Sequence, residues 1–222
     1  LIDMEKYLHV VIISEDQTVF AHLHPDDNAP LTQEAIDRSV YTVRYTFPKS
    51  GTYLVSTDYA HGTQLESKQF RVDVVGGSGQ RADARTYPSP GAFGGYTVSM
   101  DHGGAFAGEV TTLKFSVTKD GAPVTDMKPY LSAVSHISVV KNDLSAFVHT
   151  HGEVHALGTP YPPIVVRNGK IIHSMSAMTS PSSFGPAFEA HVLFPSEGRY
   201  TVWAQINVGG RVIPTSFTVD VE

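Results

Sequence analysis

Residues 9–24 have the sequence HVVIISEDQTVFAHLH, and residues 136–151 have the sequence HISVVKNDLSAFVHTH. Each stretch opens with a histidine, carries twelve residues before a second histidine, and ends with a third histidine two positions later. Aliphatic and β-branched residues flank a short polar segment in both, which is typical of two strands joined by a turn. The chain is therefore expected to be a tandem repeat of a β-rich unit.

A second pair of stretches extends this repeat toward the end of each half. Residues 47–53 (FPKSGTY) match residues 194–200 (FPSEGRY), and the alignment continues without a gap to FRVDVV at 70–75 and FTVDVE at 217–222. Many short strands at regular spacing, separated by turn residues, predict an all-β chain. The predicted fold is two tandem immunoglobulin-like antiparallel β-sandwich domains.

The two halves have unequal lengths. The first domain is predicted to span residues 1–75, and the second to span residues 93–222. Residues 76–92, which are rich in glycine, proline and polar side chains, are predicted to be the linker. The second domain opens with two strand candidates, 96–100 and 110–118, that have no counterpart in the first. The first sandwich is therefore expected to lack its opening strands.

Three further elements are predicted locally. The run SVYTVRYTF at 39–47 alternates in the manner of a strand, and a short helix is expected near 31–38. The second domain also carries an insertion at 159–186. Within it, Asn168-Gly169 between two apolar runs predicts a hairpin with a type I′ turn.

Composition excludes several functional classes. A net charge of -6, without a cluster of lysine and arginine, argues against a nucleic-acid partner. No apolar run approaches the ~20 residues that a membrane span needs. The absence of cysteine excludes disulfides, thiolate catalysis and cysteine-based zinc sites, and it fits a periplasmic or secreted protein. Because the chain starts at Leu1 without methionine, it is expected to be a processed product that has lost its signal peptide.

The histidines of the second domain are predicted to form a metal site. If the hairpin turns at Asn142-Asp143 with a two-residue loop, His136 faces His149 directly, with Cβ atoms ~4.5–5.5 Å apart. His151 then lies one diagonal step away on the same face, because side chains alternate along a strand. Three imidazoles that converge in this way can share one ion at metal–nitrogen distances of ~2.0–2.1 Å.

The first domain repeats this arrangement. A turn at Glu15-Asp16 would place His9 opposite His22, with His24 as the third member of a second metal site. The alternative is structural: histidines near strand ends often bond a carbonyl or cover an aromatic ring. A duplicated domain inherits such residues together, so the repeat by itself does not establish metal ligation.

Additional candidate ligands lie in the second domain. His155 and His173 fall in or beside segments without a counterpart in the first repeat, and His191 lies on a predicted strand. Met175 and Met178 follow His173 closely, and thioether sulfur together with imidazole favours copper over zinc. The alternative for both methionines is that they fill gaps in a hydrophobic core.

These residues resemble a class of exported bacterial β-sandwich proteins. The motifs that carry the resemblance are SED (14–16), FAHLHP (20–25) and FPKSGTY (47–53) in the first half, and MKPYL (127–131), FVHTH (147–151) and GRYTVW (198–203) in the second. They look like YtkA-like and CopC-like immunoglobulin-fold modules that are associated with copper and heavy-metal handling. One departure is Gly152, which replaces the proline that follows the histidine pair of the first half.

The function predicted from these observations is an exported metal-binding protein for copper or zinc. It would buffer the metal, deliver it to a metal-exchange protein partner, or confer resistance. Two alternatives stay open. One is a zinc-dependent hydrolase or hydratase, for which Glu153 and, less directly, Glu189 are the nearby carboxylates. The other is an extracellular interaction module that binds no metal and accepts a strand from another chain.

Overall fold

The computed structural model describes residues 5–61, 64–76, 83–154, 164–167, 170–172 and 181–222. It confirms the all-β class, because every element of this part of the chain is a strand except the helix α1 (Gln33–Arg38). This helix lies within the range expected for it, and Thr32 is its N-cap. The chain divides into two compact units, one of Leu1–Arg85 with Asn142–Leu144 and the other of Thr86–Lys141 with Ser145–Glu222. In the part described, no helix combines the length and apolar character that a membrane crossing requires.

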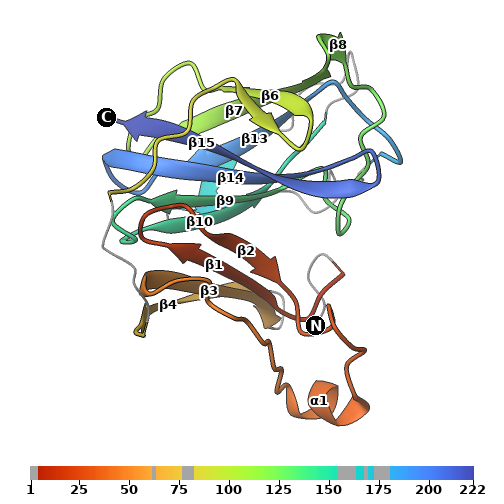
Figure 1. Cartoon of the computed structure of the whole chain (residues 1–222), viewed down its shortest axis with the longest axis vertical. Coiled ribbons are helices and arrows are strands. Elements are labelled where there is room, and N and C mark those ends of the chain that lie inside the picture. The colour runs from red at the N-terminus through yellow and green to blue at the C-terminus, as the bar shows by residue number, and fades with distance from the viewer. Residues whose placement is uncertain (1–4, 62–63, 77–82, 155–163, 168–169, 173–180) are drawn as a thin grey trace. The chain divides into compact units, whose positions relative to one another are not determined.

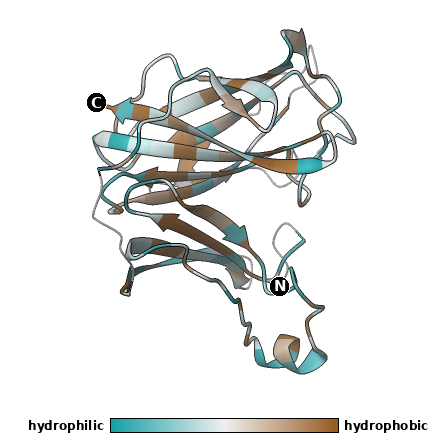
Figure 2. Ribbon diagram, viewed as in Figure 1, coloured by the Kyte–Doolittle hydropathy of each residue, from teal (hydrophilic) through white to brown (hydrophobic). Residues whose placement is uncertain are grey.

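The first unit contains one antiparallel sheet of four strands in the order β2-β1-β3-β4. Its strands are β1 (His9–Ser14), β2 (Phe20–Leu23), β3 (Gly51–His61) and β4 (Gln64–Val74). Figure 2 shows hydrophobic residues along much of β1. Val10, Ile12 and Tyr53 are buried together on one face of the sheet, so this face forms the core of the unit.

The second unit has two sheets (Figure 1) and, in addition, a separate hairpin. One sheet, in the order β10-β9-β14-β15, is built from β9 (His136–Lys141), β10 (Phe147–His151), β14 (Gly198–Val208) and β15 (Arg211–Val221). The other, in the order β13-β7-β6-β5, is built from β5 (Gly91–Phe93), β6 (Tyr96–Asp101), β7 (Val110–Lys119) and β13 (Ala187–Leu193), with β8 (Ala122–Pro123) paired to β7. The hairpin consists of β11 (Val165–Arg167) and β12 (Lys170–Ile172). The turn expected at 168–169 lies outside the described residues.

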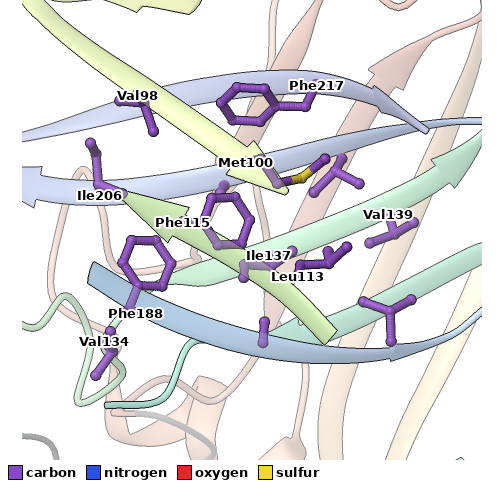
Figure 3. Packing of buried hydrophobic residues seen from close by; sticks show 14 of the residues in the cluster. Val98, Met100, Leu113, Phe115, Val134, Ile137, Val139, Phe188, Ile206 and Phe217 are labelled. Carbon is purple, nitrogen blue, oxygen red and sulfur yellow. The ribbon is translucent and has the colours of Figure 1, made fainter. Parts of the chain in front are cut away.

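The core of the second unit lies between its two sheets, which makes this unit a sandwich. Ile137 and Val139 of one sheet pack with Phe115 and Phe188 of the other (Figure 3). The rings of Phe115 and Phe188 stack with centroids 4.7 Å apart. Burying each of these side chains contributes about 1.5–3 kcal/mol, so the apolar alternation of the strands accounts for the two-layer arrangement.

The predicted linker at 76–92 is described only in part, and its limits stay a prediction. Residues 77–82 lie outside the described residues. Tyr87 already exchanges hydrogen bonds with Thr218 of β15, at 2.8 Å to the threonine hydroxyl and 2.9 Å from its backbone nitrogen. The chain therefore joins the second unit several residues before β5 begins.

The prediction of a strand at 39–47 is wrong, although side chains of the segment do alternate in burial against the core. The segment forms no ladder, yet Val43, Tyr45 and Phe47 pack against the core of the first unit. Its counterpart in the repeat is β13, which pairs along β7. The described residues of the first unit contain no strand equivalent to β7. In the described part of the first unit, residues 39–47 therefore have no partner strand with which to form a ladder.

The predicted facing of the histidines is also wrong, by two residues. His151, and not His149, is the register partner of His136, and the partner of His22 is Val11. The cause is the length of the loop between β9 and β10. The backbone nitrogen of Lys141 donates to the carbonyl of Ala146 at 2.9 Å, so the loop has four residues and not the two that were predicted. A four-residue loop moves the register by two, and a shift of two keeps every side chain on its predicted face.

The turn itself is repeated with its backbone conformation. The nitrogen of Ser14 donates to the carbonyl of Val19 at 3.1 Å, which closes a four-residue loop like that between β9 and β10. In these loops Gln17 and Leu144, which occupy equivalent positions, both have the left-handed conformation, with φ of 59° and 60°. The two hairpins therefore share a turn that sequence matching alone did not identify.

A buried tyrosine is repeated in the same way. The hydroxyl of Tyr53 donates to the carbonyl of Lys49 at 2.9 Å, and that of Tyr200 donates to the carbonyl of Ser196 at 2.8 Å. Both tyrosines are fully buried. Each hydroxyl ties the start of a long strand to the loop before it, which explains why FPxxGxY recurs in both halves.

The substitution Tyr200→Phe is expected to lower the free energy of unfolding of the second unit by about 0.5–1.5 kcal/mol, because loss of the hydroxyl removes its hydrogen bond to the carbonyl of Ser196. Urea denaturation followed by the fluorescence of Trp203 measures the change. Tyr96→Phe, on a half-buried ring of β6, is the control and is expected to change stability by less than about 0.5 kcal/mol. Equal unfolding midpoints for Tyr200→Phe and the unaltered chain would contradict this role.

Candidate metal centre

The histidines of the second unit are positioned by one hairpin. His136 opens β9, and its register partner His151 closes β10, while His149 lies two residues before His151. Because Ile137 and Val139 point into the sandwich core, the alternating positions of β9 point to the opposite face. All three imidazoles therefore lie on the outer face of the sheet, at the end where the hairpin is open.

These three imidazoles converge closely enough to hold a metal ion. Each of His136, His149 and His151 offers one nitrogen, and the three nitrogens lie within 4.8 Å of one another. The ring centroids are 5.7 Å apart for His136 and His149, 4.8 Å for His136 and His151, and 5.0 Å for His149 and His151. Three imidazoles bound to one tetrahedral ion have ring centres roughly 5 Å apart, so the side chains need only small adjustments.

The first unit builds nearly the same triangle. Its ring centroids are 5.2 Å apart for His9 and His22, 4.9 Å for His9 and His24, and 4.6 Å for His22 and His24. Nε2 of His22 lies 3.0 Å from Nδ1 of His9, and Nε2 of His24 lies 3.2 Å from the same atom. His24 follows β2 and is held by the loop after it, so the third imidazole is not part of the ladder.

The electrostatics of His24 combine burial with a carboxylate. Burial lowers the pKa of His24 below its usual value, because an imidazolium is poorly solvated there. The hydrogen bond and the charge of Asp27, whose Oδ1 lies 3.0 Å from Nδ1 of His24, oppose this shift without overcoming it. The neutral imidazole that a metal requires is thus the favoured form.

The other predicted ligands are not brought into this group. His155 and His173 lie outside the described residues, as do Met175 and Met178. His191 is buried on β13, in the other sheet, with Nδ1 3.2 Å from the hydroxyl of Thr112. Among the described residues of the second unit, the group that can hold an ion does not include His191.

Two carboxylates near the first triplet were not predicted. Asp27 bonds the ring of His24, and Asp58 of β3 is the register partner of His9. The sequence does carry a signal for Asp27, because an aspartate side chain can hydrogen-bond a backbone group three residues earlier in the chain. No comparable signal marks Asp58, since its position opposite His9 follows from pairing between strands far apart in the chain.

Together, the fold and the site define an all-β protein whose clustered histidines can hold a metal ion. The chain belongs to a family described as a domain of unknown function (DUF8832), whose model matches residues 2–76 and 91–222. The two matched stretches lie in both units and leave out Leu1 and residues 77–90. No curated protein matches the chain.

Acid is expected to destabilise the metal-free first unit. A lowered folded-state pKa of His24 means that the unfolded chain takes up this proton first. The stability that depends on neutral His24 is present above the ordinary pKa of 6.5 and is lost as the pH falls through the folded-state value. Hydrogen exchange of the β1 and β3 amides, corrected for intrinsic rates, should show less protection at about pH 5.5 than at about pH 7.5.

His24→Gln removes this titration and should reduce the pH dependence of protection, whereas His61→Gln, at an exposed position at the end of β3, should retain it. Equal pH dependence in the unaltered chain and the His24→Gln variant would show that His24 does not carry the effect.

Proposed function

We propose that this chain is an exported metal-binding protein that buffers or delivers copper or zinc. The triplet His136, His149 and His151 is the principal ligand set of the proposal, and His9, His22 and His24 form a second set. The observation that carries the proposal is the convergence of the three nitrogens of the second unit within 4.8 Å. Three neutral imidazoles leave a fourth position of a tetrahedral ion open, which suits an ion that has to be passed on.

The repeat supports a role beyond structure for these residues. The two triangles of rings have closely similar dimensions, although the loops that follow His24 and His151 differ. A histidine kept only to cover a neighbouring ring needs one contact. It does not need two further imidazoles at the spacing that one ion requires. The same arrangement on two sheets is therefore better explained by a ligand common to all three rings.

The choice between copper and zinc depends on which other ligands are present. Imidazole suits both metals, whereas thioether sulfur favours Cu(I). Met100 and Met127 are buried in the core of the second unit, as Figure 3 shows for Met100, so they fill space between the sheets. Met175 and Met178 are the remaining thioethers near a histidine, and the proposal for copper over zinc rests on them.

Export is the part of the proposal that rests on sequence. The chain contains no cysteine, in keeping with an oxidising compartment in which thiols are readily oxidised. Its motifs resemble those of exported YtkA-like and CopC-like modules linked to heavy-metal handling. A periplasmic or extracellular location would give open histidine sites access to metal without competition from cytosolic thiols.

Elemental analysis of the full chain after metal loading and desalting tests the ligand assignment. The unaltered chain should retain copper or zinc in proportion to its two triplets. His149→Ala/His151→Ala should lose the share of the second unit, because a single imidazole holds an ion weakly. His102→Ala, which removes a histidine outside both triplets, is the control and should retain all of the metal. A chain that retains no metal in any form would overturn the proposed function.

Metal affinity is also expected to depend steeply on pH. Coordination requires neutral imidazole, and protons compete for each of the three nitrogens of a triplet. Affinity should therefore fall sharply below about pH 6. Competition titration with a chromophoric chelator between about pH 7.5 and pH 5, corrected for protonation of the chelator, measures this fall. Affinity that is constant across that range would exclude imidazole ligation.

A further inference from the structure

Both oxygens of one carboxylate hold His24 in place. Oδ2 of Asp27 accepts the backbone N–H of His24 at 2.7 Å, and Oδ1 lies 3.0 Å from Nδ1 of its ring. The backbone N–H of Asp27 in turn donates to the carbonyl of His24 at 3.2 Å. Pro25 lies between them, and its restricted φ favours a turn at this position. Backbone and ring of His24 are thus fixed by the same side chain.

This contact determines which ring nitrogen of His24 faces the other imidazoles. Nδ1 carries the proton that it donates to Asp27, so the lone pair is on Nε2. That Nε2 lies 3.2 Å from Nδ1 of His9, and Nε2 of His22 lies 3.0 Å from the same atom. In a tetrahedral ion with metal–nitrogen bonds of ~2.0–2.1 Å, ligand nitrogens are roughly 3.3 Å apart.

A cation can use all three of these nitrogens together. Nδ1 of His9 carries at most one hydrogen, so it can donate to only one of the two nitrogens that approach it. With the proton of His24 committed to Asp27, the ring of His24 has none to offer toward His9. An ion at the centre accepts the lone pairs of all three imidazoles at once.

The second unit has no carboxylate at the corresponding places. Its chain continues from His151 through Gly152, whose backbone nitrogen donates to the carbonyl of Ser135 at 2.8 Å. A Cβ at Gly152 would lie 3.0 Å from Cβ of Ser135 and from Cδ2 of Phe188, so a proline at this position would crowd both side chains. Val154, which is equivalent to Asp27, instead packs against the core.

The strand that pairs with the first histidine of each triplet also carries a carboxylate only in the first unit. His9 is the register partner of Asp58, whereas His136 is the register partner of Gln205. Directly paired residues have Cβ atoms ~4.5–5.5 Å apart on one face of a sheet. The first triplet therefore has two nearby carboxylates, one on the strand beside His9 and one bonded to the ring of His24. The second triplet has uncharged residues at both equivalent positions.

We propose that His9, His22 and His24 form the tighter of the two divalent-cation sites, and that Asp27 is the positioning residue responsible. This inference rests on the proposed metal-binding function. A carboxylate that bonds the free nitrogen of a ligating histidine fixes the orientation of the ring and raises its basicity. Loss of such a partner typically costs 10–100-fold in metal affinity. Negative charge near the site further favours a doubly charged ion.

The test uses the full chain and Zn²⁺ alone, with affinities from competition against a chromophoric chelator. His149→Ala/His151→Ala reports the first site, and His9→Ala/His22→Ala reports the second. The first site should bind Zn²⁺ at least about tenfold more tightly. The substitution Asp27→Asn is then added to the His149→Ala/His151→Ala chain. It should weaken zinc binding at the first site by about 10–100-fold.

Asp26→Asn in the same background is the matched control. Asp26 lies in the same loop and carries the same charge, but its carboxylate bonds Nζ of Lys6 at 2.8 Å. Its loss should change zinc affinity by less than about fivefold, the size of a surface ion pair. A difference between the two variants therefore reports the contact with the ring of His24 and not the charge of the loop.

A spectroscopic measurement separates positioning from a structural role. Long-range ¹H–¹⁵N correlation spectra of the metal-free chain should show His24 protonated at Nδ1, and Asp27→Asn should increase the population protonated at Nε2. The amide signals of β1 and β3 should stay in place in both chains. A tautomer unaffected by Asp27→Asn would overturn the assignment of Asp27.

The outcomes distinguish this inference from the function on which it rests. If no chain binds zinc or copper, the proposed function fails. If both triplets bind but the second binds more tightly, or if Asp27→Asn and Asp26→Asn bind zinc equally well, metal binding stands and the order of the sites is overturned. If only the His9→Ala/His22→Ala chain binds, the first site does not exist and the inference is again overturned.

Discussion

The alternation of side chains along β9 is the constraint on which the candidate metal centre depends. Ile137 and Val139 have to face the second sheet of the sandwich, where their burial contributes about 1.5–3 kcal/mol each. His136 is then committed to the outer face. A register slip of one residue would turn the imidazoles into the core of the sandwich and the aliphatic side chains out of it, so packing between the two sheets selects the face on which a metal can be bound. The core thereby specifies the site without contacting it.

The two histidine clusters are held by the same local features. The β1–β2 and β9–β10 hairpins each have a four-residue loop with a left-handed residue at an equivalent place, Gln17 or Leu144, and each unit has a buried tyrosine bonded to the loop before its long strand. These features hold the register of β1 with β2 and of β9 with β10. What diverged is the chain beyond the last histidine. There the first unit makes a turn with Asp27, and the second continues as an extended chain toward β13.

Sequence periodicity predicted strand positions well, because burial on one face imposes alternation wherever a strand lies on a core. It failed at 39–47 for a related reason. Val43, Tyr45 and Phe47 alternate because they cover a core, but a strand also needs a neighbour for its backbone, and alternation carries no information about that neighbour. The predicted register of the histidines was wrong by two residues, because the polar side chains near the turn did not reveal how long the loop is. The prediction that they share one face survived, since any even shift preserves it.

By itself, the sequence determined the all-β class and the convergence of three histidines on one side of a hairpin, because these follow from local alternation and from spacing within one short segment. Only the tertiary structure decided which carboxylates lie beside the imidazoles. Asp58 reaches His9 through pairing of strands more than forty residues apart, and Asp27 reaches His24 only because the loop folds back on itself. Contacts of this kind depend on strand register and loop conformation, which residue identity and periodicity do not specify.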